Sequence, residues 1–166
     1  MSARIGFVWL NRLSAITLAI AIGSCPSVSA KADDEVLQVL DWTPNRMMIE
    51  LDGSIEFFVG AEFKNLAGGR RGGALLLRSD GGDVSAAMTI GGIVRELGWT
   101  TIVPMRAQCY SACAMIWAAG ADRHVARGAV IGFHGPYSLV GENQITQGIF
   151  GSSYYAEYYR NLGYGE

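Results

Sequence analysis

The hydrophobic pattern of the chain changes repeatedly, from short apolar runs to longer segments with apolar residues at helical spacing. The short runs are bounded by glycine or polar residues and predict strands over residues 47–51, 74–77, 100–103, 125–126 and 130–133. The longer segments predict helices over residues 55–66, 84–97, 112–119 and 154–162. Strands that alternate with helices indicate β-α-β units and a largely parallel sheet, so the predicted fold class is α/β. The unbroken run at 74–77 is typical of a strand covered on both faces.

Polar residues and glycines mark the ends of the predicted helices. Ser54 is expected to cap the helix at 55–66, and Asp83 is expected to cap the helix at 84–97. Gly98 directly follows the second of these helices, at the position where glycine often ends a helix. Several other glycines fall where strands and helices meet, which is where ligands bind in open α/β sheets.

The first thirty residues have the pattern of a secretory signal peptide. Arg4 and Arg12 are their only charges, residues 14–23 form a short apolar run, and residues 28–30 (Val-Ser-Ala) suit a cleavage site. We therefore expect an exported, periplasmic protein with no stable membrane span after cleavage. Two alternatives stay open, which are lipidation through Cys25 and an uncleaved N-terminal membrane anchor.

The segment that follows the signal peptide (1–30) is long enough for one domain. It has 136 residues, with a polar lead-in at 31–45 and an α/β domain at 46–166. Its 11 basic and 15 acidic residues give a net charge of −4, so nucleic acid is not an expected partner. Half of the full chain is apolar, which excludes a largely disordered protein. Its 22 glycines among 166 residues require a local explanation, such as tight turns or close approach of the backbone to another group.

Ser111 lies between a predicted strand and the predicted helix at 112–119, and two roles fit this position. As a helix cap, its hydroxyl oxygen would accept a hydrogen bond from a free backbone N–H group. As a nucleophile, its hydroxyl would lie at the positive end of the helix, with the N–H of Ala112 available to an oxyanion. Position alone favours the cap, because caps are far more common than nucleophiles.

A serine nucleophile needs a base, and the segment after the signal peptide contains two histidines. His134 follows the predicted strand at 130–133, whose carboxyl end is expected to face the same crevice as Ser111. A buried histidine that only makes hydrogen bonds would fit the same position. His124 lies in a predicted polar turn and is expected to be an exposed surface residue.

Gly81 and Gly82 follow the predicted strand at 74–77 and form a further candidate element. They suit a turn before the helix capped by Asp83, and their bare N–H groups also suit an oxyanion hole or contact with an extended substrate. The segment lacks the pattern of a phosphate-binding loop. Two separated histidines and a cysteine pair make no recognised metal-ligand set, so we expect neither a metal nor a cofactor.

The motif around Ser111 excludes one serine-hydrolase scaffold and resembles another. Cys109 and Cys113 replace the two glycines of the G-x-S-x-G elbow, so the α/β-hydrolase scaffold does not fit. Three segments instead resemble, in order, those of the Clp protease proteolytic subunit and the wider crotonase-like fold, and most closely those of exported bacterial Clp-like proteins. They are residues 79–84 (Ser-Asp-Gly-Gly-Asp-Val), residues 107–112 followed by 118–120, and residues 131–136 (Ile-Gly-Phe-His-Gly-Pro). The resemblance covers about residues 47–164 and implies the repeated β-α-β units of the ClpP/crotonase-like fold.

This resemblance implies a role for each candidate residue. Ser111 would be the nucleophile and His134 the general base. The N–H groups of Gly82 (or Gly81) and Ala112 would form the oxyanion hole. Attack on an amide or ester would then proceed through an acyl-enzyme.

The resemblance also carries two expectations about the C-terminal part. In the family, the element after the histidine strand helps to assemble rings, so a homo-oligomer is expected. The family also has an aspartate beyond the histidine, whereas Glu142 and Glu157 are the acids available here and neither lies in a matching motif. Three explanations stay open, which are a Ser-His dyad without a third residue, an acid from another subunit, and a domain that is incomplete at its C-terminus.

Cys109 and Cys113 flank Ser111 at i and i+4 spacing. In a reducing compartment either could be a buried thiol or the nucleophile itself. In an exported protein the pair suggests a disulfide, because α-carbons at this spacing in a helix lie about 6 Å apart, within bridging range. We expect a disulfide that locks the turn around Ser111.

Four tyrosines in the last predicted helix, Tyr154, Tyr155, Tyr158 and Tyr159, could stack against a ligand. Aromatic residues at helical spacing more often form contact surface, which favours packing against the body of the protein or a neighbouring subunit.

Together these features predict an exported serine hydrolase or peptidase-like protein that acts on peptide or acyl substrates. The leading alternative is a catalytically degenerate Clp-like protein that binds or assembles with partners. A third is a crotonase-like acyl-thioester enzyme, which would use the paired N–H groups without a serine. The presence of Ser111, His134 and both oxyanion segments favours the enzyme, and the missing acid favours the degenerate form.

Overall fold

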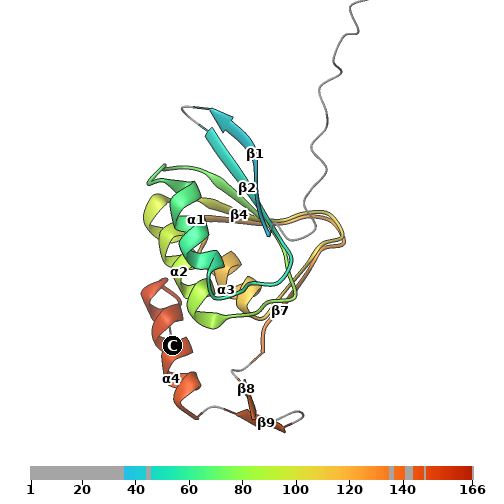
Figure 1. Ribbon diagram of the computed structural model, residues 1–166, viewed down its shortest axis with the longest axis vertical. Helices are drawn as coiled ribbons and strands as arrows, with labels where there is room; N and C mark the ends of the chain where they lie inside the picture. Colours follow the sequence, from blue (N-terminus) through green and yellow to red (C-terminus); the bar gives the residue numbers. More distant parts are fainter. Residues whose placement is uncertain (1–35, 44–45, 135–136, 141–143, 148, 166) are drawn as a thin grey trace, which may run out of the picture. The chain divides into compact units, whose positions relative to one another are not determined.

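The computed structural model describes residues 36–43, 46–134, 137–140, 144–147 and 149–165 (Figure 1). The chain divides into two compact units, Met1–Lys31 and Ala32–Glu166, and the described residues all belong to the second. The expected signal peptide at 1–30, with Cys25, lies outside them. In the described ranges, no helix combines the length and the apolar character needed to cross a bilayer.

A five-stranded sheet is central to the fold, with strand order β1-β2-β3-β4-β6. Its strands are β1 (Leu37–Thr43), β2 (Arg46–Asp52), β3 (Ala74–Arg78), β4 (Thr100–Val103) and β6 (Asp122–Val125). β2, β3, β4 and β6 run parallel, and β1 pairs with β2 in the antiparallel sense. The predicted α/β class with a largely parallel sheet is confirmed.

Two further strand pairs extend the fold. β5 (Gln108–Tyr110) and β7 (Val130–Gly132) are parallel, and β8 (Tyr137–Val140) and β9 (Gln144–Gln147) form an antiparallel pair. The sequence did not predict β5, β8 or β9. Residues 37–43, within the expected polar lead-in at 31–45, form β1 by pairing with β2.

The described helices are α1 (Val59–Ala67), α2 (Val84–Leu97), α3 (Ala112–Ala119) and α4 (Ile149–Asn161). α2 packs against both α1 and α3. As predicted, Asp83 caps α2, since its side chain accepts a hydrogen bond of 2.7 Å from the Ala86 N–H. Gly98 ends α2 with the predicted left-handed backbone, at φ 67°.

The start of α1 differs from the prediction. The helix begins at Val59 rather than residue 55, and Ser54 is not its cap, because the Ser54 hydroxyl donates to Glu56 Oε1 at 2.8 Å. Ile55 instead forms an isolated parallel bridge with Gly82. Backbone pairing with the loop that contains Gly81 and Gly82 (the glycine loop) therefore overrides helical periodicity at this position.

The central sheet is fully buried on one face only. Leu75 and Leu77 of β3 are 0% exposed, whereas Leu76 between them is partly exposed. On the side of Leu76, Arg78 Nε donates to Glu50 Oε1 at 2.8 Å. The prediction that strand 74–77 is covered on both faces is wrong, because helices bury alternate positions and an ion pair lies on the other face.

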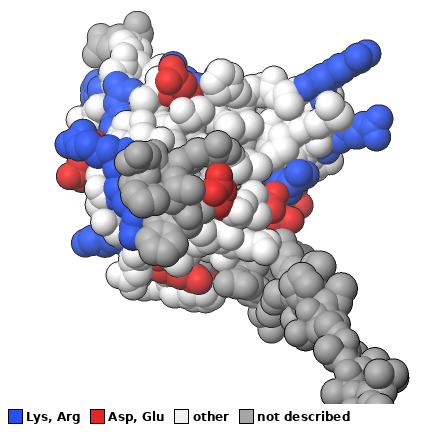
Figure 2. Space-filling model, turned by 90° about the horizontal axis from the view of Figure 1, so that it is seen from above, with Lys and Arg blue, Asp and Glu red and all other residues white. Residues whose placement is uncertain are grey.

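Charged side chains of both signs are distributed over the face shown in Figure 2. Basic side chains lie along one edge of this face, and others extend outward from the opposite edge. Acidic side chains lie among and between them. This face is therefore not covered by charge of a single sign.

Candidate active site

Ser111 lies in the sharp turn between β5 and α3. Its backbone has φ 56° and ψ −121°, a conformation that L residues other than glycine rarely adopt. Its side chain makes no capping hydrogen bond to α3, so the helix-cap interpretation is wrong. The Ser111 hydroxyl is therefore carried on a strained strand-to-helix turn without serving the helix, and such outliers often mark functional sites.

The Ser111 turn is bridged by a disulfide between Cys109 in β5 and Cys113 in α3. The two α-carbons are 5.2 Å apart, and both residues are 0% exposed. The expected disulfide is present. It also removes both cysteines as alternative nucleophiles, because a disulfide sulfur is not a thiolate.

The glycine loop packs directly against this turn. Gly81 has φ 109°, and a Cβ at its position would lie 2.7 Å from Ser111 Cβ and 3.2 Å from Ala112 N. Only glycine fits this approach, because any side chain there would overlap the turn. The structure therefore places the two predicted oxyanion segments side by side.

The hydrogen bonds of the loop determine which N–H groups are available there. The Gly81 N–H donates to Ser79 Oγ at 3.0 Å, and the Asp83 N–H donates to the Ile55 carbonyl at 2.6 Å. In the part of the chain that the structure describes, the N–H groups of Gly82 and Ala112 donate to no protein acceptor. Of the two glycines considered from the sequence, the geometry favours Gly82 as an oxyanion donor.

His134 lies at the same edge of the fold as Ser111. β5 and β7 pair in parallel with Tyr110 opposite Gly132, and the Ser111 N–H donates to the Gly132 carbonyl at 2.9 Å. His134 follows Gly132 by two residues and is exposed. Parallel register therefore brings the predicted base close to the predicted nucleophile, at the carboxyl ends of neighbouring strands.

The other titratable candidates are not brought to this edge by any described element. His124 is exposed as expected, but it lies in strand β6 rather than in a turn. Glu142 lies outside the described residues. Glu157 is exposed on α4 and lines a different hollow, together with Met88 and Tyr154. Within the described ranges, no group of three or more His, Cys, Asp and Glu side chains could hold a metal ion.

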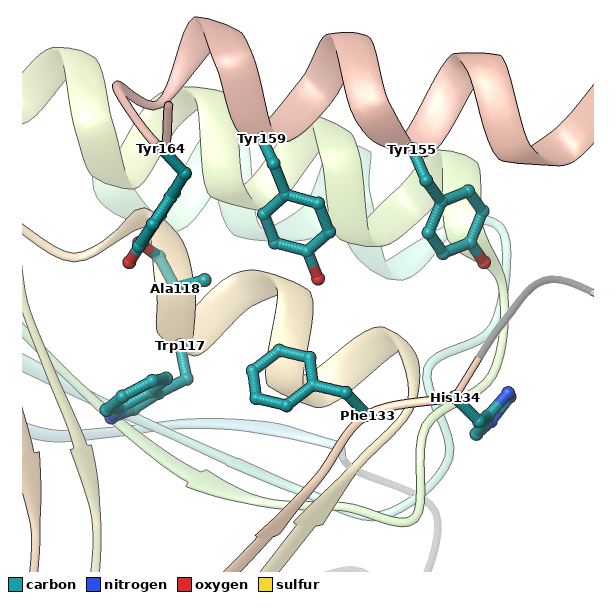
Figure 3. A pocket seen from close by; sticks show the side chains of 7 residues that line it. All are labelled: Trp117, Ala118, Phe133, His134, Tyr155, Tyr159 and Tyr164. Carbon is teal, nitrogen blue, oxygen red and sulfur yellow. The ribbon is translucent and has the colours of Figure 1, made fainter. Parts of the chain in front are cut away.

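A hollow of about 420 Å³ begins beside His134 and lies between α3 and α4 (Figure 3). Aromatic side chains form most of its wall, and the lining residues are Trp117, Ala118, Phe133, His134, Tyr155, Tyr159 and Tyr164. The sequence identified only His134, Tyr155 and Tyr159 among them. The i, i+4 spacing of the two tyrosines was the available signal, whereas the others come from separate elements and meet only in the fold.

Among the tyrosines of α4, Tyr158 packs against the body of the protein, and Tyr155 and Tyr159 line this hollow. The Tyr158 hydroxyl donates to the Met115 carbonyl at 3.0 Å, which confirms the predicted packing against the body of the protein. Burial raises the pKa of Tyr158 above its ordinary value of 10 and raises the pKa of Tyr159 to about 12, and neighbouring tyrosines add to both shifts. Both rings therefore stay neutral well above physiological pH, and the partly buried Tyr158 hydroxyl holds α4 through its hydrogen bond.

Comparison with known proteins supports the fold. No family model matches the chain, and no curated protein matches its sequence significantly. Two solved structures of the 1510-N membrane-bound stomatin-specific protease are similar, a serine-to-alanine mutant and a lysine-to-alanine mutant in complex with a substrate peptide. The first has 19% identity, a TM-score of 0.58 and coverage of 69% of this chain and 60% of that one. The second has 20% identity, a TM-score of 0.58 and coverage of 68% and 56%.

These similarities confirm the predicted fold, which is that of the ClpP-like and crotonase-like proteins. The chain spans less than two thirds of the length of the protease structures that it matches.

Proposed function

We propose that the protein is a serine hydrolase with Ser111 as nucleophile and His134 as general base, acting on peptide or acyl substrates. The observation that carries this proposal is the Ser111 turn, where a strained backbone presents a hydroxyl that does not cap its helix. The similarity of the fold to a protease supports the same class of chemistry.

The reaction follows from the groups at this edge. Ser111 Oγ attacks the substrate carbonyl while the His134 imidazole takes the hydroxyl proton. The negative charge that develops on the carbonyl oxygen is stabilised by the N–H groups of Gly82 and Ala112. The bond to the leaving group then breaks, the imidazolium returns the proton to that group, and the acyl group stays on Ser111 until water releases it as an acid.

Both oxyanion donors are fixed before substrate binds. Gly82 is held by the bonds that its neighbours make to Ile55, and Ala112 is the first residue of α3. The positive end of the helix macrodipole adds to the stabilisation of an oxyanion beside Ala112. Donors held in place in this way need little reorganisation during the reaction, which is the usual source of oxyanion-hole catalysis.

A fluorophosphonate probe, which reacts with activated serines, tests the proposal. Folded wild-type protein should be labelled, Ser111→Ala should not react, and His134→Ala should react about 100-fold more slowly or less, since a general base supplies roughly 10²–10⁴-fold. His124→Ala is the matched control, because it removes an exposed histidine from another strand, and it should be labelled like wild type. Absence of labelling in correctly folded wild-type protein would instead favour the degenerate binding module.

We further propose that the protein acts in an oxidising compartment after export. The Cys109–Cys113 disulfide supports this, because structural disulfides persist outside the reducing cytosol. Mass spectrometry of the N-terminus in cell fractions tests it. A chain that begins after residue 30 supports cleavage, whereas an intact Met1 in a cytoplasmic fraction contradicts it.

A further inference from the structure

The aromatic hollow shares one residue, the predicted base, with the candidate active site. His134 contributes to its lining, and in Figure 3 His134 lies at one end of the row of labelled side chains, with Trp117 and Tyr164 at the other. The hollow therefore extends away from the reacting groups along the space between α3 and α4. Its volume of about 420 Å³ lies in the range of small-molecule sites, roughly 300–1,000 Å³.

The walls of the hollow are mostly aromatic. Phe133 is 56% exposed, and its ring lies edge-on to that of Tyr159 with centroids 6.4 Å apart. The small side chain of Ala118 leaves room on the α3 side. At the end away from His134, the Arg123 guanidinium lies over the Tyr164 ring, 5.7 Å from its centroid. An apolar group would therefore lose water on entering, and it would gain contact with aromatic surface.

Hydrogen bonds fix α4 and the residues that follow it, on one side of the hollow, to α3 on the other side. The Tyr158 hydroxyl donates to the Met115 carbonyl at 3.0 Å, and the Tyr164 hydroxyl donates to the Ala118 carbonyl at 2.9 Å. Both acceptors lie in α3. The space is therefore formed before any ligand arrives, which reduces the entropic cost of binding.

We infer that the hollow binds an apolar acyl group of the substrate, an inference that rests on the serine hydrolase function proposed above. The acyl group stays attached to Ser111 between the two chemical steps, whereas the leaving group must depart after the first. A hollow beside the predicted base can hold the acyl part through both steps. Two sources share this chemistry, which are a fatty-acyl chain and the apolar side chain of the residue that supplies the scissile carbonyl.

Hydrolysis of p-nitrophenyl acetate and p-nitrophenyl octanoate by wild-type protein tests the inference. The value of kcat/KM should be at least about tenfold higher for the octanoate, because buried methylenes add binding energy. Ala118→Leu should remove this preference by filling the space. Phe133→Ala, which truncates a half-exposed wall residue and should fold normally, should reduce the preference severalfold.

Met105→Ala is the matched control. Met105 is 61% exposed, close to the exposure of Phe133, but it lies at the other end of β5 from Ser111 and lines a different hollow. The ratio of kcat/KM for the octanoate to kcat/KM for the acetate should be the same in Met105→Ala as in wild type. Equal hydrolysis of both esters by wild type would overturn the inference and leave the hydrolase function standing.

Peptide substrates separate the two sources of the apolar group. A fluorogenic peptide with phenylalanine before the scissile bond, compared with one with glycine, should show the same dependence on Ala118 if the group is a side chain. Preference in the ester series alone identifies a fatty-acyl chain. A preference in either series supports the inference. The absence of a preference in both series would overturn it.

Octanoate binding to Ser111→Ala, followed by calorimetry, separates this inference from the function on which it depends. One outcome is that Ser111→Ala binds octanoate and loses this binding when Ala118→Leu is added, while the wild-type protein hydrolyses no ester or peptide. That outcome supports the hollow as an apolar site and rejects the hydrolase function. Absence of both octanoate binding and hydrolysis rejects both.

Discussion

The Ser111 turn and the surroundings of His134 are held in place by different means. Ser111 lies inside a loop closed by the Cys109–Cys113 disulfide, and Gly81 packs against its Cβ. His134 follows a strand of three residues, is exposed, and shares a hollow with rings of α4. The nucleophile is therefore fixed mainly by its own neighbours, whereas the base has surroundings that depend on a helix farther along the chain.

This difference separates two kinds of preorganisation. A hydroxyl on a strained turn keeps its direction only if the turn cannot relax, so local covalent and steric constraints suit it. A base must take up a proton and return it, and hydrogen-bond geometry around it often tightens only when substrate is bound. Changes to the turn should therefore have large effects on both stability and labelling, and changes to α4 should have smaller ones.

The largest effect is expected from Gly81→Ala. The new Cβ would meet Ser111 Cβ and the Tyr110 carbonyl oxygen at 2.7 and 2.9 Å, on a backbone with φ 109°. Backbone strain costs about 1–3 kcal/mol and overpacking about the same, so the free energy of unfolding should fall by about 2–5 kcal/mol. Urea denaturation measures this loss, and fluorophosphonate labelling of Ser111 should disappear at protein concentrations where the variant is still folded.

Gly92→Ala gives the matched comparison for this substitution. Gly92 lies in the middle of α2, is exposed, and would place its Cβ in open space. The same chemical change should stabilise the protein by about 0.5–1 kcal/mol, because alanine is the better helix former. If Gly81→Ala were as stable as Gly92→Ala, the close approach of the two loops would be wrong.

Removal of the disulfide should have the next largest effect. The double substitution Cys109→Ala, Cys113→Ala should lower the free energy of unfolding by about 2 kcal/mol, the amount expected for so short a loop. Labelling of Ser111 should fall as well, because the left-handed backbone loses its covalent restraint. Unchanged labelling in the double variant would show that Gly81 and the Gly132 hydrogen bond suffice to hold the turn.

The fold and the Ser111 turn could be predicted from sequence because their signals are local. The apolar run at 74–77, the Asp83 cap and the Gly98 helix end act over a few residues. The structure confirms the strand, the cap and the helix end, although one face of the strand is less buried than predicted. The disulfide was also predicted, from the i, i+4 spacing of a helix, but the two cysteines are brought within bridging range by the turn between β5 and α3.

Other features depend on contacts between distant segments and could not be predicted in this way. Ile55 leaves the expected helix because Gly82 offers it backbone hydrogen bonds. β5 is too short to show a period of its own, and it forms because β7 lies beside it. The aromatic hollow likewise joins α3, the end of β7 and α4, so no single stretch of sequence predicts it.

The smallest effect is expected from Tyr158→Phe. The substitution removes the hydrogen bond to the Met115 carbonyl and should cost about 1 kcal/mol. Hydrogen exchange should speed up in α4, while the amides at the start of α3 exchange as in wild type. Tyr154→Phe is the control, because that ring is 63% exposed, and it should change neither. Equal acceleration in α3 and α4 would show that the two regions open as one unit.

The free energy of unfolding should depend on pH through two tyrosines of α4, Tyr158 and Tyr159. Burial raises the folded-state pKa of Tyr158 above 10 and that of Tyr159 to about 12, so from about pH 10 the unfolded chain releases protons that the folded chain retains. Their contribution to stability is fully present below about pH 10 and is lost as the pH rises through 12. Urea denaturation at about pH 9 and pH 11 should show this loss, and Tyr158→Phe should reduce it, because phenylalanine does not ionise. The same loss in the variant would trace the alkaline sensitivity to groups outside this contact, and the attachment of α4 would then not depend on the buried hydroxyl.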